Sequence, residues 1–252
     1  MPTQPQKPTI ILASGSWYPA SSFDPLAVVL QKHGYRTRNI AWPSITHATQ
    51  VKSLEDDIAV LRGVIQPETA AGRDVVVLAH SWAGMPVNSG LGGLIKSETG
   101  GNEGKGGGNG VVKLLFIAAF MTEDGQSLVS TFGGEAEWYV KDTVNATISP
   151  STPFDLFFHD VPDGREWAST LRPAAWSTTI APATGAAYLS LPSAYLFCEE
   201  DRALPLFLQQ AMVDKARSNG ADVRSESVRT GHSPWLVEGG AERVAEWVMR
   251  EV

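Results

Sequence analysis

The sequence predicts an α/β fold, with a mostly parallel central sheet covered by helices on both faces. Short apolar runs alternate with longer amphipathic runs along most of the 252 residues. The apolar runs are continuous, which is typical of parallel strands that are buried on both faces. Hydrophobic residues make up 43% of the chain, and the length suits one such domain with a modest insertion.

The elements can be placed in order along the chain. The expected strands lie at residues 9–13, 35–41, 74–79, 111–120, 194–197 and 223–228. The expected helices lie at residues 24–33, 53–71, from Ser81 onward, 203–219 and 238–252. Gly34 and Gly72 end the first two helices, as glycine commonly does. In the second helix Leu54, Ile58 and Leu61 are spaced to share one face.

Two segments interrupt this alternation. Residues 89–110 are dense in glycine, so the second half is expected to be a mobile surface loop. It is not a phosphate-binding loop, because Gly106 follows Lys105 where Ser or Thr is required, and Thr99 replaces the first glycine. Residues 121–192 are rich in Trp, Phe, Pro and Ser and show helical patches but no strong buried strand. We expect them to form a small, mainly helical cap, or lid, over a core made of residues 1–120 and 193–252.

The composition excludes several functions. The net charge of −7 and the scattered Lys and Arg residues are unsuited to nucleic acid. The chain has no signal-peptide pattern and no apolar run of membrane-spanning length, so neither secretion nor a membrane partner is expected. The single cysteine, Cys198, favours a cytoplasmic location, where the sequon at Asn145 would be accidental. No metal-ligand spacing or dinucleotide motif is present, so we expect no metal and no cofactor, and a small molecule as partner. The oligomeric state is open, and a homodimer is compatible with the sequence.

A serine stands between a buried strand and a helix in Ala79-His80-Ser81-Trp82-Ala83-Gly84. This placement fits the nucleophile elbow, G-x-S-x-G, with Ala79 and Ala83 at its two small positions. The strained turn exposes Oγ at the edge of the sheet, and the helix directs its N-terminus at a developing oxyanion. Ser81 is the candidate nucleophile; the alternative is a serine that only caps a helix.

A histidine follows the last expected strand, in Thr230-Gly231-His232-Ser233-Pro234. A triad on this kind of sheet runs Ser, acid, His along the chain, so His232 is the candidate base. The other histidines are expected to be structural or to line the substrate site: His33, His47, His80 and His159.

The acid is expected just after the strand at 194–197, in Cys198-Glu199-Glu200-Asp201. A carboxylate there can hold the imidazole tautomer and stabilise the imidazolium. Spacing alone leaves Glu199, Glu200 and Asp201 open. Glu123 and Asp124, which follow the preceding strand, are rivals.

With these motifs the chain resembles the cap-bearing α/β hydrolases akin to plant methyl esterases and hydroxynitrile lyases. It looks closer still to a group of uncharacterised microbial and fungal hydrolases. The matching stretches cover nearly the whole chain: residues 11–26, 78–86, 115–120, 195–210 and 231–236. The resemblance implies the α/β-hydrolase fold. In that family the acid is the Asp of an E-D-x-x-x-P segment, here Glu200-Asp201 to Pro205, which favours Asp201.

The resemblance also implies an oxyanion hole. The family has a His-Gly-small loop after its first core strand, matched here by Ser14-Gly15-Ser16, with Ser14 in place of His. The donors would be the backbone N–H groups of Ser16 and Trp82. Hydroxynitrile lyases of the family carry Lys after the catalytic His and Thr in place of the loop glycine. Ser233 and Gly15 stand at these positions, which favours ester or lactone chemistry over cyanohydrin cleavage.

Aromatic residues of the insertion can form an apolar pocket or the insertion's own core. They are Phe132, Trp138, Tyr139, Phe154, Phe157, Phe158, Trp167 and Trp176. The residues expected to bind substrate are Gly15, Trp17, Met121, Trp138, Phe157 and Trp176. The expected function is a serine hydrolase that cleaves a small, largely apolar ester or lactone through an acyl-enzyme. The alternatives are a cofactor-free lyase, C–C hydrolase or cyclase, and a ligand-binding protein with slow or vestigial activity.

Overall fold

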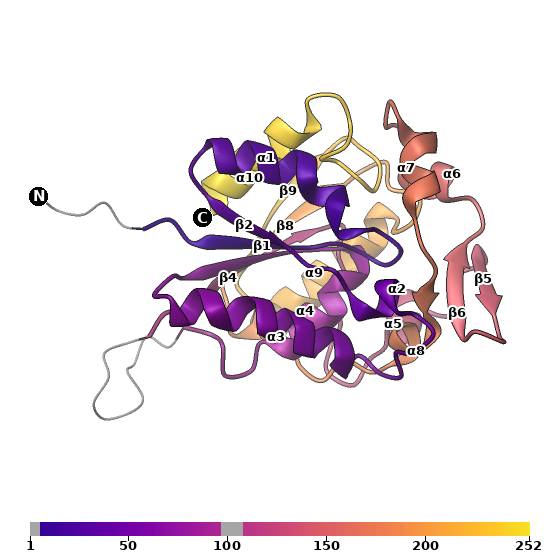
Figure 1. Cartoon of the computed structure of the whole chain (residues 1–252), viewed down its shortest axis with the longest axis horizontal. Helices are drawn as coiled ribbons and strands as arrows, with labels where there is room; N and C mark the ends of the chain where they lie inside the picture. Colours follow the sequence, from indigo (N-terminus) through magenta and orange to yellow (C-terminus); the bar gives the residue numbers. More distant parts are fainter. Residues whose placement is uncertain (1–5, 97–107) are drawn as a thin grey trace, which may run out of the picture.

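The computed structural model describes residues 6–96 and 108–252 (Figure 1). A six-stranded sheet runs through the molecule in the order β2-β1-β3-β4-β8-β9, and every neighbouring pair is parallel. Its strands are β1 (Thr9–Ala13), β2 (Arg36–Asn39), β3 (Val75–His80), β4 (Val111–Ile117), β8 (Ser193–Cys198) and β9 (Val223–Val228). The predicted parallel sheet is therefore confirmed.

The strand order contains a switch point between β1 and β3. From β1 the chain moves to the edge strand β2, and it then returns to the other side of β1 to form β3. In open α/β sheets, ligands bind beyond the carboxyl ends of the strands at such a point. The loop at Ser14–Tyr18 and the turn at Ser81, which leave these two strands, meet there.

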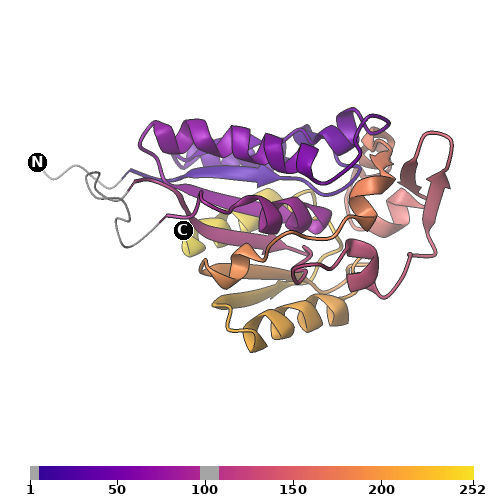
Figure 2. The same ribbon diagram turned by 90° about the horizontal axis from the view of Figure 1, so that it is seen from below.

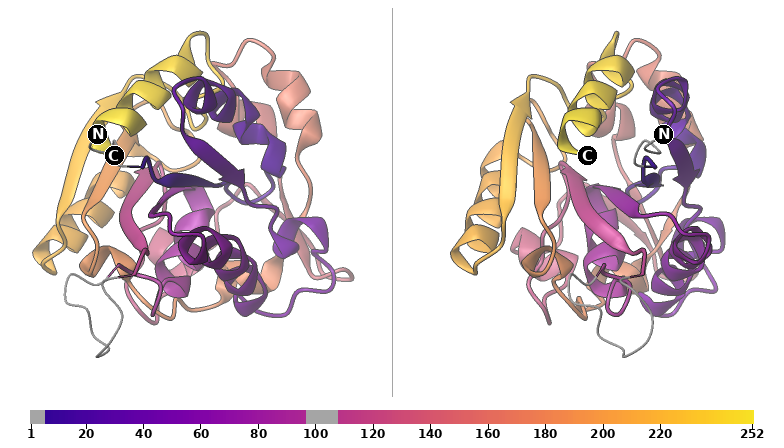
Figure 3. Two further views of the ribbon diagram at one scale, coloured as in Figure 1. Left: turned by 60° about the vertical axis from the view of Figure 1, so that its left-hand side comes forward. Right: turned by 90° about the vertical axis from the view of Figure 1, so that its left-hand side faces the viewer.

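Helices cover both faces of the sheet, as Figures 1 and 3 show. On one face α1 (Asp24–Lys32) and α10 (Gly240–Glu251) pack against each other and share a core with Ile10 and Val76. The other face carries α3 (Glu55–Ala70), α4 (Gly84–Gly90) and α9 (Leu206–Ser218). Successive strand residues enter alternate cores, so both faces of each central strand are buried. Among the described residues, no helix has the length and apolar character needed to cross a membrane.

The segment between β4 and β8 lies over the carboxyl edge of the sheet (Figures 1 and 2). Its helices are α5 (Leu128–Phe132), α6 (Pro153–Phe157), α7 (Gly164–Thr170), α8 (Trp176–Ile180) and the 3-10 turn η3 (Ala187–Leu189). It also holds an antiparallel sheet of β5 (Tyr139–Asp142), β6 (Thr147–Pro150) and β7 (Ala174–Ala175). Its three strands are short and β5 is mostly exposed, so they give no apolar run in the sequence. The boundary of this cap at 121–192 stays a prediction.

Two elements are shorter than predicted, and both differences fall where loops of the site begin. The strand expected to reach residue 120 ends at Ile117, since Ala118 turns the chain with φ +40°. The helix expected from residue 203 begins at Leu206, because residues 201–204 form the loop around Asp201. In the glycine-rich segment, Ile95 bridges to Val111, and residues 97–107, where a mobile loop was expected, lie outside the described residues.

Candidate active site

The turn after β3 places Ser81 at the carboxyl edge of the sheet. Ser81 has φ +55°, a left-handed conformation that costs a serine energy and marks a strained turn. Its carbonyl accepts a hydrogen bond from the N–H of Phe120 at 3.0 Å, which ties the turn to the chain leaving β4. A Cβ on Gly84 would come within 2.0 Å of the Phe120 carbonyl oxygen. Glycine at position 84 thus lets the helix pass close to β4.

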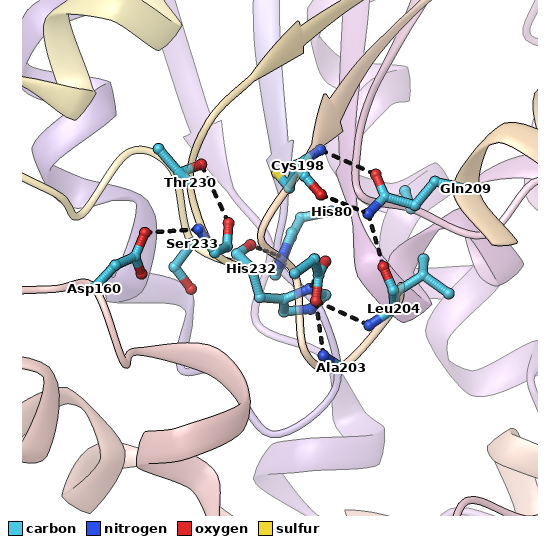
Figure 4. Close-up of polar contacts among 12 residues, drawn as sticks. His80, Asp160, Cys198, Ala203, Leu204, Gln209, Thr230, His232 and Ser233 are labelled. Carbon is cyan, nitrogen blue, oxygen red and sulfur yellow. Dashed lines mark hydrogen bonds and ion pairs between the residues drawn. The ribbon is translucent and has the colours of Figure 1, made fainter. Parts of the chain in front are cut away.

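His232 and Asp201 form a buried pair behind Ser81. His232 Nδ1 lies 2.6 Å from Asp201 Oδ2, and both side chains are at most 1% exposed. The other carboxylate oxygen accepts the N–H groups of Ala203 at 2.8 Å and Leu204 at 2.9 Å (Figure 4). Because the carboxylate accepts, Nδ1 carries the proton and Nε2 keeps its lone pair. Within the described residues Nε2 has no hydrogen-bond partner.

The rival carboxylates have partners of their own. Glu199 accepts a hydrogen bond from Ser227, and Glu200 pairs with Arg229 at 2.7 Å. Glu123 binds Asn219 at 2.9 Å, and Asp124 is exposed. The geometry therefore points to Asp201 as the partner of the imidazole.

The loop that carries Asp201 is held by a glutamine that the sequence did not reveal. The buried Gln209 side chain accepts the N–H of Cys198 at 3.0 Å and donates to the carbonyls of Cys198 at 3.1 Å and Leu204 at 2.7 Å. These bonds join the end of β8 to the far side of the loop (Figure 4). No sequence motif distinguishes such a glutamine from any other on a helix.

The loop that carries His232 is held from two sides. His80 Nε2 donates to the carbonyl of His232 at 3.0 Å, and Asp160 from the cap accepts the N–H of Gly231 at 2.6 Å (Figure 4). Burial, with the neighbouring His232 adding to it, holds the pKa of His80 well below its ordinary value, so His80 stays neutral. His80 is expected from the sequence to be structural or to line the substrate site, and these contacts fit the structural role.

The loop after β1 faces the serine. A Cβ on Gly15 would lie 2.7 Å from Ser81 Cβ, so only glycine allows this approach. The carbonyl of Ser14 accepts a hydrogen bond from Trp42 Nε1 at 2.7 Å. Within the described residues the N–H of Ser16 has no protein acceptor, while Ser16 and Trp82 both line the cavity at Ser81. The two residues predicted to supply the oxyanion donors thus line the same cavity as the serine.

That cavity lies between the sheet edge and the cap and has a volume of about 20 Å³, room for about one water molecule. Its lining is mostly aromatic and aliphatic: Ser16, Trp17, Ser81, Trp82, Phe120, Leu128, Phe132, Trp138, Tyr139, Phe157, Thr179, Ala203, Leu204 and His232. Aromatic contacts bring the cap against the core, with Trp17 stacked on Phe157 at 5.6 Å between ring centroids. An apolar lining with a few converging polar groups is typical of a small-molecule site.

Three of the six residues expected to bind substrate line this cavity: Trp17, Trp138 and Phe157. Gly15 packs beneath Ser81, and Met121 faces a neighbouring groove. Trp176 lies under Lys141, whose Nζ is 4.3 Å from the centre of its ring.

Seven lining residues were missing from that expectation: Phe120, Leu128, Phe132, Tyr139, Thr179, Ala203 and Leu204. Two of them, Phe132 and Tyr139, belong to the cap aromatics. Phe120 and Leu204 each follow a strand that ends at the site, a signal that could have identified them. Nothing in the sequence distinguishes Thr179.

Comparison with known proteins decides the family. The sequence pattern that defines the alpha/beta hydrolase family matches residues 10–247 of this chain. This chain belongs to the α/β-hydrolase family. It is 27% identical over 236 residues to the alpha/beta hydrolase nvfD of Aspergillus novofumigatus, covering 91% of each chain. It is 26% identical over 239 residues to a probable hydrolase of a Phoma species, covering 90% of this chain and 92% of the relative.

Solved structures share the fold. A pyrethroid hydrolase from Sphingobium faniae JZ-2 matches with a TM-score of 0.74 at 17% identity, over 96% of both chains. Polyneuridine aldehyde esterase matches with a TM-score of 0.75 at 18% identity, over 97% of this chain and 99% of that one. A methylesterase from Arabidopsis matches with a TM-score of 0.73 at 13% identity, over 97% and 98%. The resemblance to methyl esterases and fungal hydrolases is therefore confirmed.

In this α/β hydrolase the site residues can perform acyl transfer. The free Nε2 of His232 can take a proton from a hydroxyl in the cavity, and Asp201 can stabilise the resulting imidazolium. Backbone N–H groups at the cavity wall can stabilise a developing oxyanion. Over residues 6–96 and 108–252, no group of three His, Cys, Asp or Glu side chains is arranged to hold a metal ion.

Proposed function

We propose that this α/β hydrolase is a serine esterase or lactonase that uses Ser81 as nucleophile, His232 as base and Asp201 as the orienting acid. One observation carries the proposal. The strained Ser81 and His232 line the same apolar cavity, Nε2 of His232 has no hydrogen-bond partner in the part of the chain that the structure describes, and Asp201 lies 2.6 Å from the other imidazole nitrogen. The esterase and methylesterase names of the structural neighbours support an ester as substrate.

The reaction takes place in two steps. Ser81 Oγ forms a bond to the ester carbonyl carbon while His232 Nε2 takes the hydroxyl proton. Collapse of the tetrahedral intermediate breaks the bond to the alcohol oxygen, which receives that proton from His232. Water then attacks the acyl-enzyme with His232 again as base, releasing the acid and restoring Ser81. In a lactone the leaving alcohol stays attached to the acyl group, so the product is one hydroxy acid.

The cavity favours a small, uncharged substrate. The N–H groups of Ser16 and Trp82 would bind the oxyanion, each contributing about 3 kcal/mol to the transition state in a dry site. Among the described residues that line the cavity there is no Asp, Glu, Lys or Arg, and the cap contributes mainly apolar groups such as Trp138 and Phe157. A charged substrate would lose its hydration without gaining an ion pair.

An active-site fluorophosphonate probe with mass mapping tests the proposal. We expect labelling of Ser81 in the wild type, none at this position in Ser81→Ala, and unchanged labelling in Ser190→Ala, which alters an exposed serine. Hydrolysis of p-nitrophenyl acetate and of a small lactone should disappear in Ser81→Ala. A folded wild-type protein that neither labels nor turns over either substrate would overturn the proposal.

A further inference from the structure

We propose that a groove between α5 and α9 is an outer subsite of the catalytic cavity, which takes the apolar arm of an ester too long for the inner cavity. The inference rests on the proposed function and adds a substrate class, esters with an extended neutral acyl or alcohol chain. The groove has a volume of about 210 Å³. Its lining consists of Phe120, Met121, Glu123, Gln126, Ser130, Thr131, Phe132, Leu204, Leu208, Ala211, Met212 and Lys215.

The groove and the catalytic cavity share one wall. Phe120, Phe132 and Leu204 line both, so a single layer of three side chains separates the groove from the space at Ser81. The cavity itself is enclosed in this state, with Ser81 only 8% exposed. A substrate with a long arm needs a second space, and the groove lies next to the cavity on the other side of this wall.

One member of the shared wall is less buried than the other two. Phe120 is tied through its N–H to the carbonyl of Ser81, and Leu204 is tied at its N–H to Asp201 and at its carbonyl to Gln209. Phe132 is only partly buried and ends the five-residue helix α5.

Two glycines follow Phe132, with φ of +84° at Gly133 and +145° at Gly134. These conformations suit glycine and cap α5, since the N–H of Gly133 binds the carbonyl of Ser130 at 3.2 Å and the N–H of Gly134 binds that of Val129 at 2.9 Å. Rotation of the Phe132 side chain would join the two spaces.

The groove suits a neutral apolar chain. Its floor is formed by Met121, Leu208 and Met212, of which the two methionines are buried. The charges on its rim are already paired, since Glu123 lies 3.5 Å from Lys215 and accepts a hydrogen bond from Asn219 at 2.9 Å. A charged ligand would have to displace these contacts, whereas an alkyl chain would bury its surface without disturbing them.

A tryptophan placed in the groove tests the subsite without touching the catalytic cavity. Ala211 is exposed on α9 and lines only the groove, so Ala211→Trp should fill it and keep the fold. Gln210→Trp, one exposed position away and outside the groove lining, is the matched control. The substrates are p-nitrophenyl acetate, butyrate, hexanoate and octanoate, together with a matching series of alkyl acetates that extends the alcohol arm.

We expect kcat/KM of the wild type to rise by up to about fourfold for each methylene that enters the groove. Ala211→Trp should lower kcat/KM for the longest member of at least one series by about tenfold or more, and change that for acetate less than twofold. Gln210→Trp should leave both profiles unchanged. Phe132→Ala, which removes the less buried member of the shared wall, should shift the preference towards the longer chains.

Failure of the subsite is distinguishable from failure of the proposed function. If wild type and Ala211→Trp show the same chain-length profile in both series, the subsite is wrong while ester hydrolysis stands. A binding measurement tests the subsite if the protein hydrolyses none of these esters. In Ser81→Ala, calorimetry with the octanoate ester should show affinity that the added Ala211→Trp weakens about tenfold, and equal affinities would refute the subsite.

Discussion

Replacing Asp201 with asparagine separates the charge of this side chain from its shape. Oδ2 accepts the Nδ1–H of His232 at 2.6 Å, and Oδ1 accepts two backbone N–H groups at 2.8 and 2.9 Å. The amide of Asn can keep its oxygen towards the two backbone donors only by turning its NH₂ towards Nδ1. The imidazole proton then moves to Nε2, where the base must have a lone pair.

The expected loss follows from this geometry. With the wrong tautomer favoured and the imidazolium no longer stabilised, kcat should fall about 10⁴-fold, which corresponds to about 5 kcal/mol. The opposite orientation of the amide would leave its NH₂ facing two backbone donors inside a buried loop, which costs about 1–3 kcal/mol for each unsatisfied group. Both orientations therefore impair the site, while the side chain keeps its volume and the fold should persist.

The assay is kcat for p-nitrophenyl acetate, with a thermal melt to show that the variant is folded. Glu200→Gln is the matched control, because Glu200 is a neighbouring carboxylate that pairs with Arg229 on the surface. We expect its kcat to change less than threefold, since exposed ion pairs contribute little. An Asp201→Asn enzyme within tenfold of wild type would refute the reasoning, and a larger loss in Glu200→Gln would reassign the acid.

Two further predictions concern groups that surround the site. Asp160→Ala leaves the N–H of Gly231 without its acceptor, so we expect the free energy of unfolding, measured with urea, to fall by about 2 kcal/mol. We also expect a lower kcat with little change in KM. Asp160→Asn, which keeps an acceptor oxygen, should largely restore both. Equal kcat in all three proteins would contradict this. Burial raises the pKa of Asp57 to about 7, although the N–H of Ser44 donates to it. Between about pH 4 and pH 7 the native state therefore holds a proton that the unfolded state has released, and stability should fall as pH rises, by roughly 4 kcal/mol at most. Urea unfolding at several pH values should show this slope in the wild type and a weaker one in Asp57→Asn; identical slopes would count against the buried neutral acid.

The sequence predicts the central sheet because a strand that is buried on both faces appears in the sequence as a continuous apolar run. Val75–His80 is apolar almost throughout, since both faces of the strand are buried by helices. The cap lacks such a pattern. The strand Tyr139–Asp142 is half-exposed at its first residue and exposed over the rest, and its pairing with Thr147–Pro150 depends on a turn in which Asp142 accepts the N–H groups of Val144 and Asn145. Such a hairpin is fixed by local hydrogen bonds, which hydrophobic periodicity does not report.

The same distinction applies to the cavity. Ser81, Asp201 and His232 each follow a strand, so the parallel sheet brings them to one edge. The cap residues have no such rule, because their positions depend on how the cap packs against the core. Trp138 and Trp176 come from the same aromatic-rich segment, yet Trp138 lines the cavity and Trp176 lies beneath Lys141.

The two alanines in the serine motif acquire a clear explanation from the structure. In the pattern G-x-S-x-G the small residues flank the nucleophile at positions occupied here by Ala79 and Ala83, and both are fully buried with their methyl groups accommodated. The approaches that exclude a Cβ lie elsewhere, at Gly84 against Phe120 and at Gly15 against Ser81 itself. Glycine is thus required at position 84, one residue after Ala83, and at position 15 in the facing loop. A search for this elbow in related chains should therefore allow alanine two positions before and two positions after the serine, and require glycine at the positions equivalent to 15 and 84.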